Sequence, residues 1–177
     1  SLSLNPEFRA YYHWRNFKEN SNWYQYSNYN YYYYGKFASS MPEFNFDYQK
    51  TRDKIVDIMS KWVNAGVSGF RIDAVKHAYM KEEVATQAGD KIIKDTDKVS
   101  GEDYSSNLTK NLHLFRKINA RLKAIDPNVF IVGENFDGHA YHVAPYYEGL
   151  DGMLNFYMYY NLSQATSMGG IQDFWHY

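Results

Sequence analysis

Two short segments carry the residue types that could do chemistry in this chain. Residues 69–77 read GFRIDAVKH, and residues 129–135 read VFIVGEN. Each begins as a short apolar strand and reaches a carboxylate, Asp73 in the first and Glu134 in the second. A carboxylate at the exit of a buried strand is costly unless it is paired or used. Two carboxyl groups on neighbouring strands form the pair that glycoside hydrolysis needs, one as nucleophile and one as proton donor.

The residues around Asp73 match a strand with two different faces. Arg71 and Asp73 are two positions apart and therefore point to one side of the strand, while Phe70 and Ile72 point to the other. This is the layout of a barrel strand whose polar side chains point inward near its end. An isolated Arg-x-Asp pattern would favour a structural ion pair, but a second acid, Glu134, at the end of another predicted strand favours a functional site.

Helices with clear apolar periodicity separate these strands. Apolar side chains three and four positions apart predict a helix over residues 48–65, with Asp47 as N-cap and Gly66 as C-terminal stop. A second helix is predicted over residues 108–125 and ends before Pro127. The apolar faces consist of Ile55, Ile58, Met59 and Trp62 in the first helix and Leu108, Leu112, Phe115, Ile118, Leu122 and Ile125 in the second.

The remaining segments complete an alternation of strands and helices. After a strand over residues 129–133 we predict a short helix near 142–148, a strand around 153–158, and a helix or frayed tail over 161–177, while residues 81–104 read as a polar insertion. This order predicts an α/β fold with a parallel sheet. A full eight-unit barrel needs about 250 residues. The 177 residues therefore predict a partial barrel.

Composition excludes several classes of protein. The 19 basic and 20 acidic side chains nearly balance, which gives no electrostatic footprint for nucleic acid, and no apolar run approaches a membrane span. The chain has no cysteine, which excludes disulfides and thiolate metal sites but leaves the compartment open. The chain has 19 tyrosines and 11 phenylalanines. This excess has two explanations, a genome rich in Tyr, Asn, Lys and Phe codons and an aromatic surface that stacks on sugars, and we favour the first. Residues 5–47 read as loops with one or two short strands rather than as a binding platform.

Four segments together resemble the α-amylase superfamily of glycoside hydrolases. Residues 69–77 look like its fourth-strand signature, and residues 132–135 look like its fifth-strand signature. Residues 41–47 (MPEFNFD) resemble the block that closes the inserted B domain. Residues 5–15 and 22–23 look like B-domain sequence of neopullulanase-like and oligosaccharide-cleaving members.

The resemblance covers nearly the whole chain in order and at plausible spacing, and it implies two domains. Residues 1–47 are expected to be the C-terminal part of a B domain, and residues 48–177 a partial (β/α)8 TIM barrel. That part of the barrel would comprise about strands 4 to 6 with helices 3 to 5.

The resemblance implies a retaining glycoside hydrolase of α-1,4-glucans or maltooligosaccharides. Asp73 would be the nucleophile and Glu134 the general acid and then base, with the pKa of Glu134 raised by burial and by proximity to Asp73. Arg71 would keep the nucleophile ionised through a charge-assisted bond. Lys76 and His77 would line the acceptor side of the substrate cleft, in a pairing commoner in enzymes that act on α-1,4-glucans. The alternative for these two residues is a pair of solvated loop charges.

The chain also departs from the family. It has no Asn-His-Asp block to supply the third acid, and the third-strand block is missing. We therefore expect a central segment of the barrel that is nearly inactive alone and that self-associates through unpaired strand edges. No cofactor is required for the implied chemistry. Calcium (Ca²⁺), held in many members partly by the backbone carbonyl at the His77 position, is expected only in a full-length parent, because an Asn ligand belongs to the missing block.

Two other functions stay open at this point. A transglycosylase would use the same residues with a sugar as acceptor. A non-catalytic, amylase-like carbohydrate-binding protein would keep the fold and lose the chemistry, although the joint presence of Arg71, Asp73 and Glu134 argues against it. His139 and His142 could share a helix face but have no partner cluster in the sequence, so we interpret them as surface or loop residues.

Overall fold

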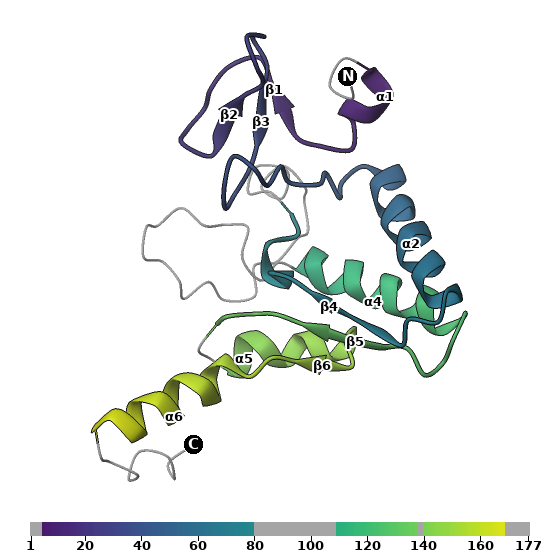
Figure 1. Cartoon of the computed structure of the whole chain (residues 1–177), viewed down its shortest axis with the longest axis vertical. Helices are drawn as coiled ribbons and strands as arrows, with labels where there is room; N and C mark the ends of the chain where they lie inside the picture. The colour runs from purple at the N-terminus through teal and green to yellow at the C-terminus, as the bar shows by residue number, and fades with distance from the viewer. Residues whose placement is uncertain (1–4, 80–108, 138–139, 169–177) are drawn as a thin grey trace. The chain divides into compact units, whose positions relative to one another are not determined.

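The computed structural model describes residues 5–79, 109–137 and 140–168, and it separates the chain into two compact units (Figure 1). The units comprise residues 1–57 and 58–177, so their boundary falls within helix α2 (Gln49–Asn64). The predicted insertion over residues 81–104 lies outside the described residues.

The first unit is built around a small antiparallel sheet. Its elements are α1 (Pro6–Arg9), β1 (Trp14–Arg15), β2 (Trp23–Gln25) and β3 (Tyr32–Tyr34). The strands are ordered β1–β3–β2, so the tyrosine-rich β3 is the central strand. Trp23, which is only 2% exposed, packs against the Tyr34 ring with their centroids 5.5 Å apart. The segment therefore holds three short strands where the sequence indicated one or two.

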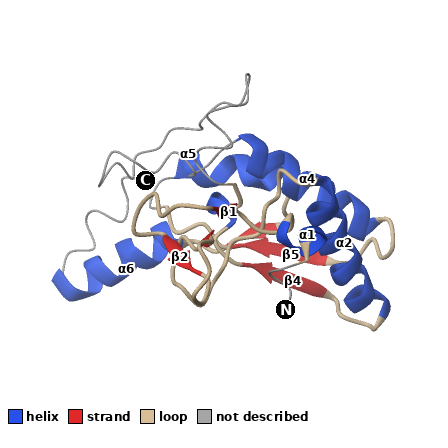
Figure 2. Ribbon diagram, turned by 90° about the horizontal axis from the view of Figure 1, so that it is seen from above, coloured by secondary structure: helices blue, strands red, loops and turns tan. Residues whose placement is uncertain are grey.

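The second unit contains the predicted parallel sheet, ordered β4–β5–β6 (Figure 1). Figure 2 shows β4 and β5 side by side. The strands are β4 (Gly69–Ile72), β5 (Phe130–Gly133) and β6 (Gly152–Met153). The other elements are α4 (Thr109–Lys123), the short helix α5 (Ala140–Val143), the 3-10 helix η2 (Ala144–Glu148) and α6 (Phe156–Met168). The predicted alternation of strands and helices is confirmed.

Helix α4 supplies much of the core of the second unit. The predicted face is buried at Leu112, Phe115, Ile118 and Leu122, together with Leu114. Ile125 lies beyond the end of the helix and is 42% exposed, so its assignment to this face was wrong. At Gly149 an added Cβ would lie 2.7 Å from the backbone nitrogen of Arg116. Only glycine permits this close approach between α4 and the segment that leads into β6.

The end of helix α2 follows the prediction, but its apolar face does not. Gly66 has φ +97°, and its N–H donates to the Val63 carbonyl, which is the expected left-handed stop. However, Trp62 is 57% and Ile58 is 43% exposed, whereas Val56 and Val63 are buried. The predicted stripe of this helix is therefore partly open to solvent.

The third strand of the parallel sheet is shorter than predicted. Residues 153–158 were expected to be extended, but β6 ends at Met153 and α6 begins at Phe156. The reason is the side chain of Asn155, whose Oδ1 accepts a hydrogen bond from the Met158 N–H at 2.8 Å. An asparagine that satisfies a free N–H of the first turn is a strong helix start.

Within the described residues, no helix is both long enough and apolar enough to cross a membrane.

The open surfaces of the second unit lead to a prediction about association. Among the described residues β4 and β6 each pair on one side only, and Trp62 and Phe130 are more than half exposed. Unpaired edges and exposed apolar groups favour association. We expect the 177-residue chain to form dimers or larger species in light scattering as concentration rises. Trp62→Lys should weaken this association, and a monomer at every concentration would contradict the expectation.

Candidate active site

The pairing of β4 with β5 brings Asp73 and Glu134 together. The last pair in the parallel register is Ile72 with Gly133, so the two acids are the next residues on neighbouring strands. The Glu134 N–H donates to the Ile72 carbonyl at 2.9 Å, and the Val75 N–H donates to the Glu134 carbonyl at 3.0 Å. The main chain of Glu134 is thus hydrogen-bonded to Ile72, just before Asp73, and to Val75, just after the turn. These main-chain bonds fix the spacing of the two acids.

The chain turns sharply directly after Asp73. Ala74 has φ 44° and ψ 46°, which is the left-handed conformation. For a residue other than glycine this conformation costs about 1 kcal/mol or more. The turn leads into a single turn of 3-10 helix, η1 (Val75–His77), whose first N–H makes the bond to Glu134. The strained residue, Ala74, therefore lies between Asp73 and Val75, whose N–H is bonded to the Glu134 carbonyl.

Arg71 contacts both acids, whereas the sequence predicted a contact with Asp73 alone. Its Nη2 lies 3.2 Å from Asp73 Oδ1 and also hydrogen-bonds to Glu134 Oε2. The same nitrogen makes both contacts, so the two carboxyl groups are close neighbours. The side chains of Arg71 and Asp73 are 51% and 64% exposed, while that of Glu134 is 18% exposed. The less exposed acid is the one that was predicted to carry a proton.

The pKa of Glu134 is raised above its ordinary value, as the sequence predicted. The largest cause is the hydrogen bond between its carboxyl group and that of Asp73, and burial of the carboxyl is the second. The positive charge of Arg71 acts in the opposite direction and lowers the pKa of Glu134. Because the raising effects prevail, Glu134 keeps its proton to a higher pH than an ordinary glutamic acid.

Lys76 and His77 are buried, which excludes the solvated loop charges considered as the alternative. They are 1% and 8% exposed. The Lys76 ammonium lies 3.0 Å from Asp137 Oδ1 and 4.1 Å from the centre of the Phe136 ring. The Phe136 ring also lies near the His77 ring, with their centroids 5.7 Å apart. The substrate contact that the resemblance implies for Lys76 and His77 stays a prediction.

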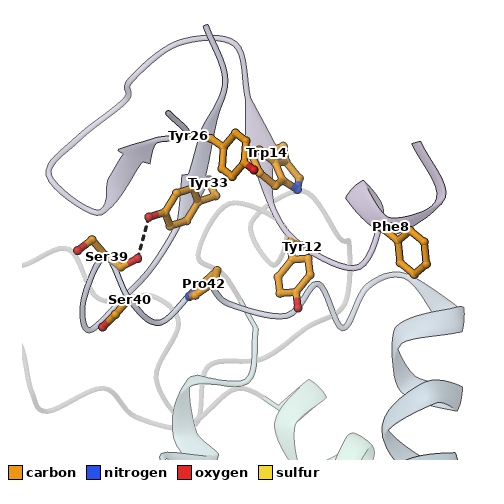
Figure 3. A pocket seen from close by; sticks show the side chains of 8 residues that line it. All are labelled: Phe8, Tyr12, Trp14, Tyr26, Tyr33, Ser39, Ser40 and Pro42. Carbon is orange, nitrogen blue, oxygen red and sulfur yellow. Dashed lines mark hydrogen bonds between the residues drawn. The ribbon is translucent and has the colours of Figure 1, made fainter. Parts of the chain in front are cut away.

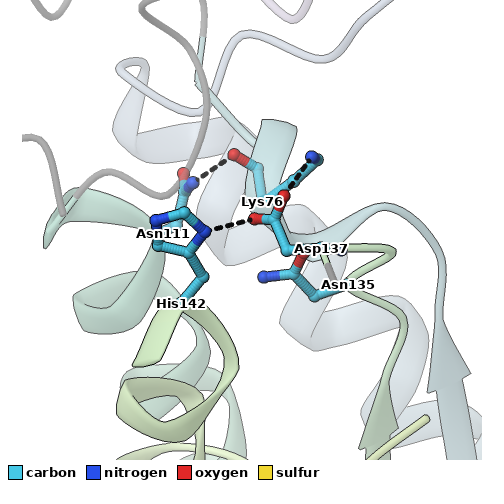
Figure 4. Close-up of polar contacts among 5 residues, drawn as sticks. All are labelled: Lys76, Asn111, Asn135, Asp137 and His142. Carbon is cyan, nitrogen blue, oxygen red and sulfur yellow. Dashed lines mark hydrogen bonds and ion pairs between the residues drawn. The ribbon is translucent and has the colours of Figure 1, made fainter. Parts of the chain in front are cut away.

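Asp137 is the centre of a buried polar cluster (Figure 4). Its carboxylate lies between the Lys76 ammonium and His142, whose Nδ1 is 3.5 Å from Asp137 Oδ2. Asn135 Oδ1 accepts the Asp137 N–H at 3.1 Å, and Asn111 donates its side-chain N–H to the Lys76 carbonyl at 2.6 Å. The cluster joins the segment after β4, the segment after β5, α4 and α5. It holds in place the two segments that follow the acids.

The sequence analysis missed this cluster and misplaced one of its members. His142 was interpreted as a surface or loop residue, but it is 0% exposed. His139 lies outside the described residues. Lys76 follows Asp73 by three positions, and Asp137 follows Glu134 by three. Both residues lie beyond the last register pair, and Lys76 belongs to the 3-10 helix η1, so the strand pattern alone could not predict their contact.

The described residues do not form a metal site of protein side chains. Within them no three His, Asp or Glu side chains gather as ligands.

The opposing effects on Glu134 can be separated by substitution. Asp73→Asn should lower the pKa of Glu134, because the largest raising effect is lost, and Arg71→Met should raise it further, because the cation is lost. The measurement is a pH titration by NMR of ¹³C-labelled glutamate carboxyl groups, with Glu134→Gln to assign the signal. An ordinary pKa of about 4.3 that neither substitution changes would contradict this assignment of causes.

The buried ion pair should matter more for stability than an exposed one. Asp137→Asn leaves the Lys76 ammonium buried beside a neutral group and should lower the free energy of unfolding by about 3–5 kcal/mol. Glu148→Gln is the matched control, because the Arg116–Glu148 pair has side chains 51% and 61% exposed. Its loss should cost about 0–1 kcal/mol. Chemical denaturation of the 177-residue chain measures both, and equal losses would refute the buried pair's role.

Comparison with known proteins identifies the family of this chain. A family model described as "Alpha amylase, catalytic domain" matches residues 5–173. The chain is 36% identical over 157 residues to "Alpha-amylase 3" of Dictyoglomus thermophilum, which covers 87% of this chain and 26% of that protein. It is 30% identical over 96 residues to an oligo-1,6-glucosidase of Bacillus cereus, which covers 48% of this chain and 17% of that protein.

A solved structure shows the same relationship at the level of the fold. The α-amylase from H. orenii superposes on 86% of this chain with a TM-score of 0.62 and 26% identity, and the match covers 28% of that structure. The chain thus spans about a quarter of the length of Alpha-amylase 3 and of the H. orenii structure.

Proposed function

The chain belongs to the α-amylase catalytic-domain family, and from that premise we propose that it carries the two reacting acids of a retaining glycoside hydrolase. Its substrates would be α-1,4-glucans or maltooligosaccharides. Residues 1–47 would be the end of a B domain, and residues 48–177 would be strands 4 to 6 of a (β/α)8 barrel with helices 3 to 5. The observation that carries the proposal is the pair Asp73 and Glu134 at adjoining strand ends, with Arg71 bonded to both.

The short distance between the two acids supports a retaining mechanism, which keeps the anomeric configuration of the sugar, over an inverting one. Inverting enzymes separate their carboxyl groups by about 6.5–9.5 Å to admit a water, whereas retaining enzymes hold them about 5–5.5 Å apart. The guanidinium nitrogen of Arg71 that contacts both carboxyl groups supports the short spacing. In this proposal Asp73 attacks the carbon whose oxygen Glu134 protonates.

In the proposed reaction the Asp73 carboxylate attacks the anomeric carbon as the glycosidic C–O bond breaks. Glu134 donates its proton to the departing oxygen, for which its raised pKa suits it. The Glu134 carboxylate then takes a proton from water, which attacks the same carbon and releases Asp73. Arg71 stabilises the ionised Asp73 through a charge-assisted bond.

The role of nucleophile and the role of proton donor can be distinguished with two substrates whose leaving groups differ in their need for a proton. We would replace the matched segment of the Dictyoglomus Alpha-amylase 3 with residues 5–173 and assay the chimera. Asp73→Asn should abolish turnover of both maltotriose and maltosyl fluoride. Glu134→Gln should lower maltotriose turnover about 10²–10⁴-fold but spare the first step with the fluoride, because fluoride departs without a proton. Equal loss on both substrates by both variants would contradict the assignment of roles.

The 177-residue chain alone serves as the control. It should show no turnover of maltotriose, because its sequence has no Asn-His-Asp block for the third acid. Turnover by the chain alone that Asp73→Asn abolishes would refute this expectation. Analysis of the chimera's products distinguishes hydrolysis from transglycosylation, since a sugar acceptor gives longer oligosaccharides.

A further inference from the structure

The first unit contains a pocket of about 410 Å³ that the proposed chemistry does not use (Figure 3). Five of its lining residues are aromatic: Phe8, Tyr12, Trp14, Tyr26 and Tyr33. They come from α1, from β1 and β3, and from the segments that adjoin these strands. All the lining residues belong to the first unit, whereas Asp73 and Glu134 belong to the second.

The lining of this pocket selects the chemistry of a ligand. It contains no Asp, Glu, Lys, Arg or His, so it offers no partner to a charged group. Ser39 and Ser40 stand opposite the aromatic side chains in Figure 3 and are exposed. The Tyr33 hydroxyl already donates to the Ser39 carbonyl at 2.7 Å, which holds that ring in place. The pocket therefore combines fixed aromatic walls with hydroxyl groups and suits a neutral ligand that has both apolar and polar surfaces.

The Trp14 ring is a fixed part of the wall. Its indole N–H is buried and has no hydrogen-bond partner among the described residues, so the ring contributes an apolar surface rather than a donor. The ring is held by edge-on contacts with Tyr26 and Tyr33, whose centroids lie 5.8 Å and 5.9 Å away.

We propose that this pocket binds a glucosyl unit of an α-glucan at a site that does no chemistry. A pyranose ring has apolar C–H faces for the aromatic walls and hydroxyl groups for the serines. The choice of an α-glucan rests on the proposed function, since the same polymer would be the substrate. In this proposal some of the chain's many aromatic side chains contact sugar, whereas the sequence analysis favoured codon usage as the reason for their number.

The test uses maltohexaose and the 177-residue chain carrying Asp73→Asn and Glu134→Gln, so that no reaction occurs. Calorimetry gives the affinity, and ¹⁵N NMR follows the four indole N–H signals, with Trp14→Phe to assign one of them. The matched pair of variants is Phe8→Ala and Phe17→Ala. Both side chains are exposed, at 43% and 51%, but only Phe8 lines the pocket.

We expect Phe8→Ala to weaken maltohexaose binding about 3- to 10-fold and Phe17→Ala to leave it unchanged. The Trp14 indole signal should shift on binding while that of Trp62 does not. No binding at millimolar maltohexaose, or equal effects of the two alanine variants, would overturn the inference. Binding of an apolar dye without maltohexaose binding would do the same. Failure of the chimera to hydrolyse maltotriose, with this binding intact, would refute the proposed function alone.

Discussion

The in-register parallel pairing of β4 with β5 is the constraint on which the candidate site depends. Because Ile72 pairs with Gly133, the next residue on each strand is an acid. Beyond the strands, the turn at Ala74 and the 3-10 helix η1 bring Lys76 to Asp137. A slip of one residue would turn one acid to the other side of the sheet. Main-chain pairing therefore sets the spacing of Asp73 and Glu134.

The two polar groups at this edge of the sheet differ in their surroundings, and this difference divides their tasks. Asp73 and Arg71 are more than half exposed, so a ligand from solvent can reach them. Lys76 and Asp137 are almost fully enclosed and hold each other's charge. Enclosed ion pairs stabilise little by themselves but are costly to break. The buried cluster thus acts as a support, while Asp73 and Arg71 are open to a ligand.

The sequence predicted the features that depend on local pattern. Periodicity located α2 and α4, and the strand ends located Asp73 and Glu134. It failed where the outcome depended on a distant partner or a competing local bond. The burial of His142 depends on Asp137, and Asn155 started a helix where a strand was expected. The exposure of Trp62 followed from the three-dimensional surroundings of α2, which periodicity along one helix does not contain.

The hydrogen bonds that join Glu134 to Ile72 and Val75 use only backbone atoms, so they do not depend on which side chains stand at positions 73 and 134. In the proposed roles, exchange of either acid for its amide would remove reactivity and leave the surrounding scaffold in place. The fold of this unit and the identity of its two acids can therefore change independently of each other.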